Sequence, residues 1–274
     1  MIQKILIANR GEIAVRIIRS CREAGIGTVA IFSDPDRMAP HVLKADEAYR
    51  VGPAPSSESY LNVPAILDVI KKSGADAVHP GYGFLSENAD FADLISSKGL
   101  TWIGPSSEAI RIMGDKMAAR NLAQSVSAPI VPGTTEPITD VKTAIQAAES
   151  IGYPILVKAA GGGGGKGMRI VNSSSELSDA FDRARSEASK AFSDDRIYIE
   201  KYLEEPHHIE IQVFADNYGK IVTLGERECS IQRRYQKIIE ESPSPFITKS
   251  VRRKLEETAR EITATSKYTG AGTE

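Results

Sequence analysis

The sequence predicts an α/β fold in two parts: a doubly wound parallel sheet over residues 1–113, followed by an α+β domain over residues 114–274. Up to about residue 104, short β-branched runs alternate with segments of helical periodicity. Neighbouring parallel strands need a crossover connection, and a helix is the usual one, so this alternation favours a parallel sheet. Beyond residue 105 the alternation stops and strand-like runs follow one another, which is typical of antiparallel hairpins.

The elements of the first part follow from apolar spacing and from capping residues. Ile13, Ile17 and Cys21 recur every three to four residues and mark one face of a helix. Pro64 suits the first turn of a second helix, and Ser86 suits the cap of a third. In chain order, the expected elements are a strand at 4–8, a helix at 13–24, a strand at 28–32, a helix at 64–73, a strand at 75–79, a helix at 86–98 and a strand at 100–103.

The second part mixes helices with paired strands. Its last helix, at residues 248–267, is long and amphipathic, and a further strand should begin soon after it. A sheet that stopped there would keep an unpaired edge, so we expect these 274 residues to be part of a longer protein. The expected elements are helices at 107–113, 116–124, 140–150, 176–191 and 248–267, and strands at 155–158, 168–171, 196–200, 208–215 and 220–224.

The composition is that of a globular protein. Hydrophobic residues make up 41% and charged residues 26%, which excludes a disordered or fibrous chain. The 36 acidic and 34 basic residues leave a net charge of -2, so a broad basic surface for nucleic acid is not expected. The 2 cysteines, Cys21 and Cys229, cannot form a disulfide framework. Without a signal peptide or an apolar run of the roughly 20 residues that span a bilayer, we expect a soluble, cytoplasmic protein that binds no membrane.

The strongest local signal is a run of five glycines at residues 161–165, flanked by lysines. Glycines let backbone N–H groups approach a phosphate closely. The Walker A pattern is not met, because Ala160 stands where a glycine is needed and Gly167 follows the lysine in place of Ser or Thr. A G-x-G-x-x-G pattern is met, but it opens into the strand at 168–171 and not into a helix. We interpret the run as a hairpin that closes over phosphates; a flexible linker is the alternative.

Three further positions are candidates for binding anions or nucleotides. Lys158 ends an apolar strand, where a lysine is uncommon unless its ammonium reaches an anion; a snorkelling surface lysine is the alternative. Lys116 follows a turn, and alone it is as well explained as an exposed lysine at a helix start. His208 shares one strand face with Glu210 and Gln212, and this polar face meets either a cleft or solvent.

The segment 226–237 concentrates three arginines and Lys237 among polar residues. Fixed cations of this kind suit a small anionic substrate or a phosphate group. A solvated basic loop is the alternative, because most charge runs are solvated. Cys229 has no evident histidine partner, and Cys21 lies on an apolar helix face, so both thiols are expected to be packed and not nucleophilic.

Together these residues resemble biotin carboxylase, the ATP-grasp ligase component of acetyl-CoA, propionyl-CoA and pyruvate carboxylases. A single motif of this kind would not be specific, but a whole series in this order is. The series covers nearly the whole chain: Lys4–Ala14, His79–Asn88, Met113–Lys116, Lys158–Met168, Glu200–Leu203, His208–Gln212 and Glu226–Lys237.

The resemblance implies a fold, a reaction and partners. The fold is a Rossmann-like pre-ATP-grasp sheet over residues 1–113, then an incomplete ATP-grasp domain over 114–274 with a glycine-rich lid at about 131–203. The reaction is a C–N ligation: bicarbonate attacks the γ-phosphate of ATP to give carboxyphosphate, whose carboxyl group passes to biotin on a carrier protein. Mg²⁺ or Mn²⁺, a biotin carboxyl carrier protein, a carboxyltransferase and a homodimer are implied too, with fatty acid biosynthesis as the setting.

The resemblance also implies site residues. Lys237 is the implied catalytic residue, because it would face bicarbonate and the transferred phosphoryl group. Lys116 and Lys158 are implied to bind the ATP phosphates, and Gly164, Gly165 and Met168 to form the closing flap. Glu200, Lys201 and Leu203 are implied to line the adenine pocket, and His208 and Gln232 to make further contacts with the nucleotide.

Two departures from the family pattern limit these expectations. Tyr235 stands where the family usually has histidine, although a phenol can still form a hydrogen bond. The implied metal ligands and bicarbonate-binding arginines lie beyond Glu274, so no residue of this sequence is assigned to a metal. Two alternatives therefore stay open: a catalytically silent ATP-binding fragment, and another ATP-grasp ligase, such as those of purine synthesis or carbamoyl phosphate formation.

Overall fold

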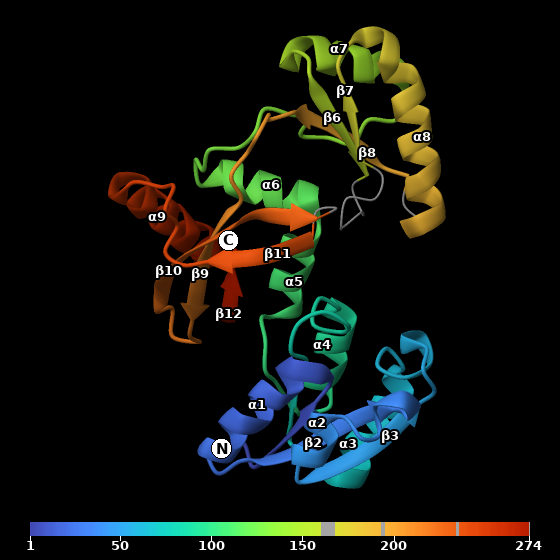
Figure 1. Cartoon of the computed structure of the whole chain (residues 1–274), viewed down its shortest axis with the longest axis vertical. Helices are drawn as coiled ribbons and strands as arrows, with labels where there is room; N and C mark the ends of the chain where they lie inside the picture. Colours follow the sequence, from blue (N-terminus) through green and yellow to red (C-terminus); the bar gives the residue numbers. More distant parts are fainter. Residues whose placement is uncertain (160–167, 193–194, 234–235, 274) are drawn as a thin grey trace. The chain divides into compact units, whose positions relative to one another are not determined.

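The computed structural model describes residues 1–159, 168–192, 195–233 and 236–273. Contacts within the chain divide it into two compact units, Met1–Arg111 and Ile112–Glu274. The first unit holds a parallel sheet, and the second holds antiparallel sheets with helices packed on them (Figure 1). The predicted α/β class is therefore confirmed.

The first unit has the strand order β3-β2-β1-β4-β5. The chain leaves β1 in one direction and later returns to its other side, which is the reversal of a doubly wound sheet. The strands are β1 (Lys4–Ile7), β2 (Gly27–Ser33), β3 (Glu47–Gly52), β4 (Ala77–His79) and β5 (Thr101–Trp102). The helices are α1 (Gly11–Glu23), α2 (Pro40–Lys44), α3 (Val63–Ser73), α4 (Ala89–Ser97) and, across the border of the units, α5 (Ser107–Gly114).

Alternation along β1 explains why helices cover both faces of this sheet. Ile5 and Ile7 pack with Ile17 of α1 on one face. Leu6 points to the opposite face, where Phe91 of α4 belongs to the same apolar cluster. Because both faces of β1 are buried, its sequence is an unbroken apolar run instead of an alternating one.

Two details of the first unit differ from the sequence prediction. Neither α2 nor β3 was predicted, because α2 has only five residues and β3 mixes charged with apolar side chains. The cap of α4 is Asn88 and not Ser86, since the Asn88 Oδ1 atom accepts a hydrogen bond of 2.8 Å from the backbone N–H of Phe91. The asparagine lies closer to the first helical turn and so satisfies a backbone donor there.

His79 ends β4 and is largely buried. Its Nδ1 atom accepts a hydrogen bond of 3.0 Å from the backbone N–H of Gly81. Burial disfavours the charged imidazolium and lowers the pKa of His79 from 6.5 to about 4. At pH values between these two pKa values, the unfolded chain therefore binds more protons than the folded chain.

This difference predicts a loss of stability in mild acid. From pH 7 to pH 5 the free energy of unfolding of the first unit should fall by about 2 kcal/mol through His79 alone. Urea unfolding followed by the fluorescence of Trp102, the single tryptophan, measures it. The variant His79→Gln keeps an acceptor for the Gly81 N–H but cannot titrate, so it should lose about 2 kcal/mol less. An equal loss in both proteins would contradict the prediction.

The second unit contains two antiparallel sheets. Their strand orders are β7-β6-β8 and β11-β10-β9-β12. The strands are β6 (Ile155–Ala159), β7 (Arg169–Val171), β8 (Ile197–Lys201), β9 (Ile209–Ala215), β10 (Ile221–Arg233), β11 (Gln236–Glu241) and β12 (Gly270–Thr273). The helices are α6 (Lys116–Ser125), α7 (Val141–Ile151), α8 (Ser174–Phe192) and α9 (Lys249–Thr265).

Each of these sheets buries one face under helices. On the first sheet, Val157 of β6 packs with Phe181 of α8 and Ala144 of α7. On the second sheet, Val213 of β9 packs with Ala259 of α9. The side chains on the other face of β6, β8 and β9 point away from these helices, and Lys158, Glu200 and Glu210 lie on this face.

The segment from 226 to 237 contains a hairpin and not a basic loop. The strand predicted at 220–224 continues to Arg233 as β10, and β11 pairs with it in antiparallel fashion. The continuation of this strand is not visible in the sequence, because the pairing of β10 with β9 shifts between Thr223 and Glu226. Such a shift breaks the period of two on which a strand prediction depends.

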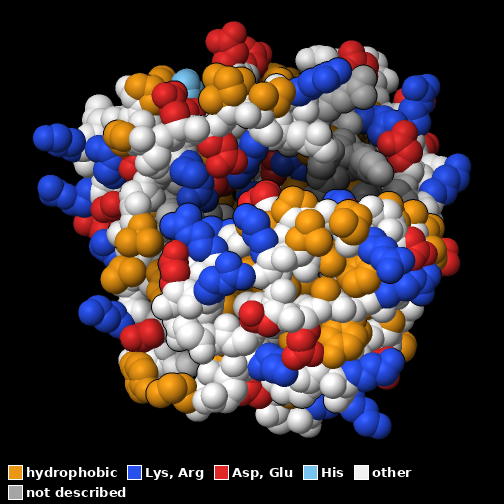
Figure 2. All heavy atoms as spheres, turned by 60° about the horizontal axis from the view of Figure 1, so that its bottom comes forward, with side chains coloured by type: hydrophobic (Ala, Val, Ile, Leu, Met, Phe, Trp, Pro, Cys, Tyr) orange, Lys and Arg blue, Asp and Glu red, His pale blue; other side chains and the backbone are white. Residues whose placement is uncertain are grey.

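Charges of both signs lie together on one face of the molecule. On the face drawn in Figure 2, Lys and Arg side chains are interspersed with Asp and Glu, with apolar side chains between them. This agrees with the small net charge of -2.

Within the described ranges, no helix is long and apolar enough to cross a membrane.

Candidate functional site

The first candidate cluster lies on strands β6 and β8, on the face of the sheet opposite to the one that α7 and α8 cover. The antiparallel register places Lys158 directly opposite Tyr198, and Leu156 opposite Glu200. The Lys158 ammonium forms an ion pair with the Glu200 carboxylate and lies 5.9 Å from the centre of the Tyr198 ring. The side chains of Lys158 and Glu200 are only 19% and 16% exposed. Lys158 is thus a held cation and not a snorkelling surface lysine.

Lys201 follows Glu200 in β8, so its side chain leaves the sheet on the opposite face. The Lys201 ammonium donates to the carbonyl oxygens of Gly152 and Tyr153, at 3.0 and 2.9 Å. Its side chain is therefore bound away from Lys158, and Lys201 could contact a ligand beside Glu200 only through its backbone. Leu203 follows the strand and is 47% exposed.

Of the remaining phosphate candidates, the flap residues lie in sequence between two strands of this sheet, and Lys116 lies at the start of a helix. Strands β6 and β7 pair in antiparallel fashion, and Met168 directly precedes β7. The glycine run therefore joins adjacent strands, as predicted, but Gly164 and Gly165 lie outside the described residues. Lys116 begins α6, which Asp115 caps by accepting hydrogen bonds from two backbone N–H groups. The side chain of Lys116 is likewise outside the described part.

The second candidate cluster surrounds Glu210 on β9. Arg227 of β10 donates to the Glu210 Oε1 atom from Nε at 2.7 Å, and the Lys237 ammonium of β11 pairs with Oε2. The His208 Nε2 atom lies 3.8 Å from the same Oε2. Burial raises the pKa of the Glu210 carboxyl, but the hydrogen bonds from Lys237 and Arg227 outweigh it, so this pKa lies below its ordinary value.

Gln232 connects two of the predicted nucleotide contacts. Its Nε2 atom lies 2.8 Å from the Nδ1 atom of His208 and 2.9 Å from the carbonyl oxygen of Cys229. His208, Gln232 and Lys237, which come from three adjacent segments of the chain, therefore gather around Glu210. A cluster with fixed cations, an imidazole and an amide can bind an anion and stabilise negative charge that develops on it.

The period of two along the strand places Glu210 on the correct face, but this spacing assigns no role to its carboxylate. Its partners Arg227 and Lys237 stand 17 and 27 residues away, on strands whose register the sequence does not reveal. The available signal was its position between His208 and Gln212, since the Gln212 Oε1 atom also accepts from Arg227, at 2.8 Å.

Comparison with known proteins places this chain in a family. Residues 1–110 match the family described as "Biotin carboxylase, N-terminal domain", and residues 115–274 match "Carbamoyl-phosphate synthase L chain, ATP binding domain". The chain is 52% identical over its full 274 residues to the biotin carboxylase of Haemophilus influenzae. The chain belongs to the biotin carboxylase family. The predicted resemblance is confirmed.

Other relatives in the biotin carboxylase family include larger subunits. The human mitochondrial propionyl-CoA carboxylase alpha chain is 51% identical over 270 residues, which are 98% of this chain and 37% of that one. Of the Haemophilus protein, the chain spans 61% of the length.

Solved structures of biotin carboxylases have the same fold. A complex of the Campylobacter jejuni biotin carboxylase with β,γ-ATP superposes with a TM-score of 0.97 at 45% identity, covering 100% of this chain and 61% of that one. The biotin carboxylase domain dimer of Hydrogenobacter thermophilus 2-oxoglutarate carboxylase, in complex with MgADP, ADP and bicarbonate, gives 0.95 at 46% identity, covering 100% and 60%.

The described residues do not form a site suited to the Mg²⁺ or Mn²⁺ that the family implies. The ligand atoms of Glu210, Cys229 and Glu240 lie within 4.8 Å of one another. However, both Glu210 oxygens are already bonded to cations, and burial raises the pKa of the Cys229 thiol. Hard divalent cations prefer oxygen ligands to a protonated thiol. No metal-assisted step is therefore assigned to these three residues.

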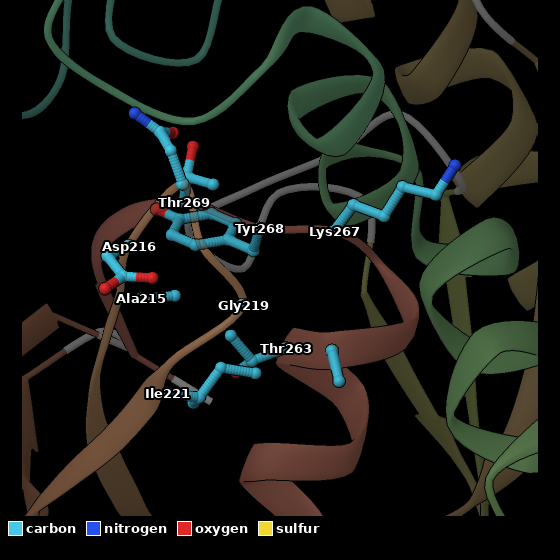
Figure 3. Close-up of a pocket in the computed structure, with 10 residues that line it drawn as sticks. Ala215, Asp216, Gly219, Ile221, Thr263, Lys267, Tyr268 and Thr269 are labelled. Carbon is cyan, nitrogen blue, oxygen red and sulfur yellow. The ribbon is translucent and has the colours of Figure 1, made fainter.

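A cavity of about 320 Å³ lies between the β9–β10 turn and the end of α9 (Figure 3). Asp216 lines it, and its Oδ1 atom accepts hydrogen bonds from the backbone N–H groups of Tyr218 and Lys220. Lys267 is the one basic residue among its described lining, and its ammonium points away from the other labelled side chains (Figure 3). Within the part of the chain that the structure describes, the lining of this cavity carries one carboxylate and one lysine whose ammonium points away, so it offers no converging cations for a nucleoside triphosphate, and the two clusters are the better nucleotide candidates.

Proposed function

We propose that this chain supplies the ATP-binding part of a biotin carboxylase. The reaction is ATP-dependent carboxylation of biotin on a carrier protein, with bicarbonate as carbon source and carboxyphosphate as intermediate. The observation that carries the proposal is the cluster around Glu210, in which His208, Gln232 and Lys237 converge in a chain of this family. Convergent cations and hydrogen-bond donors stabilise a transferring phosphoryl group.

Within this proposal, the two clusters have different roles. Lys158, with Lys116 and the flap residues Gly164, Gly165 and Met168, binds the ATP phosphates. Lys237 faces bicarbonate and the transferred phosphoryl group, and Glu210 fixes the direction of its ammonium. The adenine pocket is formed by Glu200, Lys201 and Leu203, with Lys201 acting through its backbone because its ammonium is bound elsewhere.

The proposal extends to domains and partners. Residues 1–113 are assigned to an N-terminal domain, and residues 114–274 to an ATP-grasp domain whose lid lies at about 131–203. The partners are a biotin carboxyl carrier protein and a carboxyltransferase, and the complete enzyme forms a homodimer in the cytoplasm. Mg²⁺ or Mn²⁺ accompanies ATP and is held by residues other than the described ones. The final acceptor is an acyl-CoA or a keto acid, with acetyl-CoA and fatty acid biosynthesis as the first candidate.

The test joins this chain to the remaining C-terminal segment of the Haemophilus relative and measures ADP release. We expect ADP release that requires bicarbonate and increases with free biotin. Release that requires ammonia and ignores biotin would favour a carbamoyl-phosphate type of ligase, which the description matched by residues 115–274 supports. ATP binding without any ADP release would favour a catalytically silent module.

A further inference from the structure

Tyr198 is a buried aromatic residue in direct register with the proposed phosphate-binding lysine. It pairs with Lys158 across the antiparallel strands β6 and β8, so both side chains leave the sheet on the same face. The Lys158 ammonium lies 5.9 Å from the centre of the Tyr198 ring, and Glu200 binds the same ammonium. The lysine thus has an aromatic contact and an ionic contact at once.

The ring is suited to hold a cation. Tyr198 is 6% exposed, and burial raises the pKa of its phenol, so the ring remains neutral at physiological pH. Contact with an aromatic face raises the equilibrium constant for holding a cation in place by about threefold at an exposed site and about thirtyfold where water is excluded. A free lysine side chain has many rotamers, so a contact that selects one of them lowers the entropy that ligand binding must remove.

We propose that Tyr198 is a positioning residue for nucleotide binding, whose ring holds the Lys158 ammonium in the direction of the ATP phosphates. The proposal rests on the proposed function, because it needs Lys158 to bind ATP. It adds a residue that makes no contact with ATP itself and acts only through the lysine. Without the Tyr198 ring, Glu200 would still pair with the Lys158 ammonium. The ammonium would then have no contact on the side that the ring now covers.

A purely structural role for Tyr198 is the competing explanation. Tyr198 also packs against Met117, which is 7% exposed. An aliphatic side chain of similar size would preserve most of this packing. The two explanations therefore separate when the ring is replaced by leucine, because packing is then largely kept and the cation contact is lost.

The experiment measures the dissociation constant of ATP for the chain and for two variants. Tyr198→Phe keeps the aromatic face, so its affinity should stay within about twofold of the parent chain. Tyr198→Leu loses the face and should bind ATP about tenfold more weakly. Equal affinities for the Leu and Phe variants would overturn the proposal.

A double-mutant cycle tests whether Tyr198 acts through Lys158. In a Lys158→Gln background, Tyr198→Leu should cause no further loss of affinity, whereas a structural role would add its full effect again. A spectroscopic readout needs no ATP: the ε-methylene protons of Lys158 should show an upfield ring-current shift that Tyr198→Phe retains and Tyr198→Leu removes.

The outcomes distinguish this inference from the proposed function. If Lys158→Gln leaves ATP affinity unchanged, the assigned phosphate role fails, and the positioning role fails with it. If Lys158→Gln weakens ATP but the Tyr198→Leu effect is fully additive to it, only the positioning role is refuted.

Discussion

Replacing Lys237 by glutamine should lower bicarbonate-dependent turnover of ATP about a hundredfold and leave the affinity for ATP nearly unchanged. The reason is that a fixed cation directed at a transferring phosphoryl group stabilises charge that develops only in the transition state. Glutamine keeps a polar side chain of similar reach but removes the charge. Glu210 then retains Arg227 as its cation, so the strand pairing around it should persist.

The measurement compares two lysine variants in the chain completed with the C-terminal segment of a relative. Lys158→Gln should mainly weaken ATP binding, whereas Lys237→Gln should mainly lower turnover. Lys254→Gln, at an exposed position of α9, is the matched control and should change neither quantity. An equal loss of ATP affinity in the Lys158 and Lys237 variants would refute the division of roles, and full turnover without Lys237 would remove it from the site.

The variant Phe181→Ala should destabilise the sheet that carries Lys158 by about 3–5 kcal/mol. Phe181 is 1% exposed and packs from α8 against β6, so truncation removes buried apolar area and leaves a cavity that neighbours fill only partly. ATP binding should weaken as well, although Phe181 lies on the opposite face of β6 from Lys158, because unfolding of the sheet disperses the cluster.

Hydrogen exchange of the backbone amides in β6 and α8 measures this change in local stability. Phe214→Ala is the matched control: Phe214 lies on β9 and is 49% exposed, so its truncation should cost far less. Unchanged protection of β6 in the Phe181 variant would show that the packing contributes little to this sheet.

Local regularity determined which parts of the fold could be predicted. The apolar stripe of α1 repeats every three to four residues over a long segment, and this period is visible without knowledge of the neighbours. Strand β3 lacks this signal, because only its last two residues are buried. Strand β10 hides it, because its register shifts part-way. In both cases the pairing with other strands decides the structure.

Candidate site residues can be predicted from the sequence where the residue types themselves indicate a function. Lys237 and His208 stand in polar segments that resemble a known family, so the sequence marks them as candidates, and the structure places both beside Glu210. The pairing of Lys158 with Tyr198 and Glu200 was not found, because it depends on the register of two strands about forty residues apart in the chain. The same holds for Glu210, whose cations come from the two strands beyond its own.

Under the proposed function, the charges around Glu210 affect how a nucleotide approaches this cluster. Two carboxylates, Glu210 and Glu240, accompany the cations Arg227 and Lys237, so this group of four is electrically balanced. A balanced group projects little field into solvent and cannot draw a polyanion from a distance. Under the proposed function, these four side chains add little to the long-range attraction of the nucleotide, and the cations among them act on it only after contact.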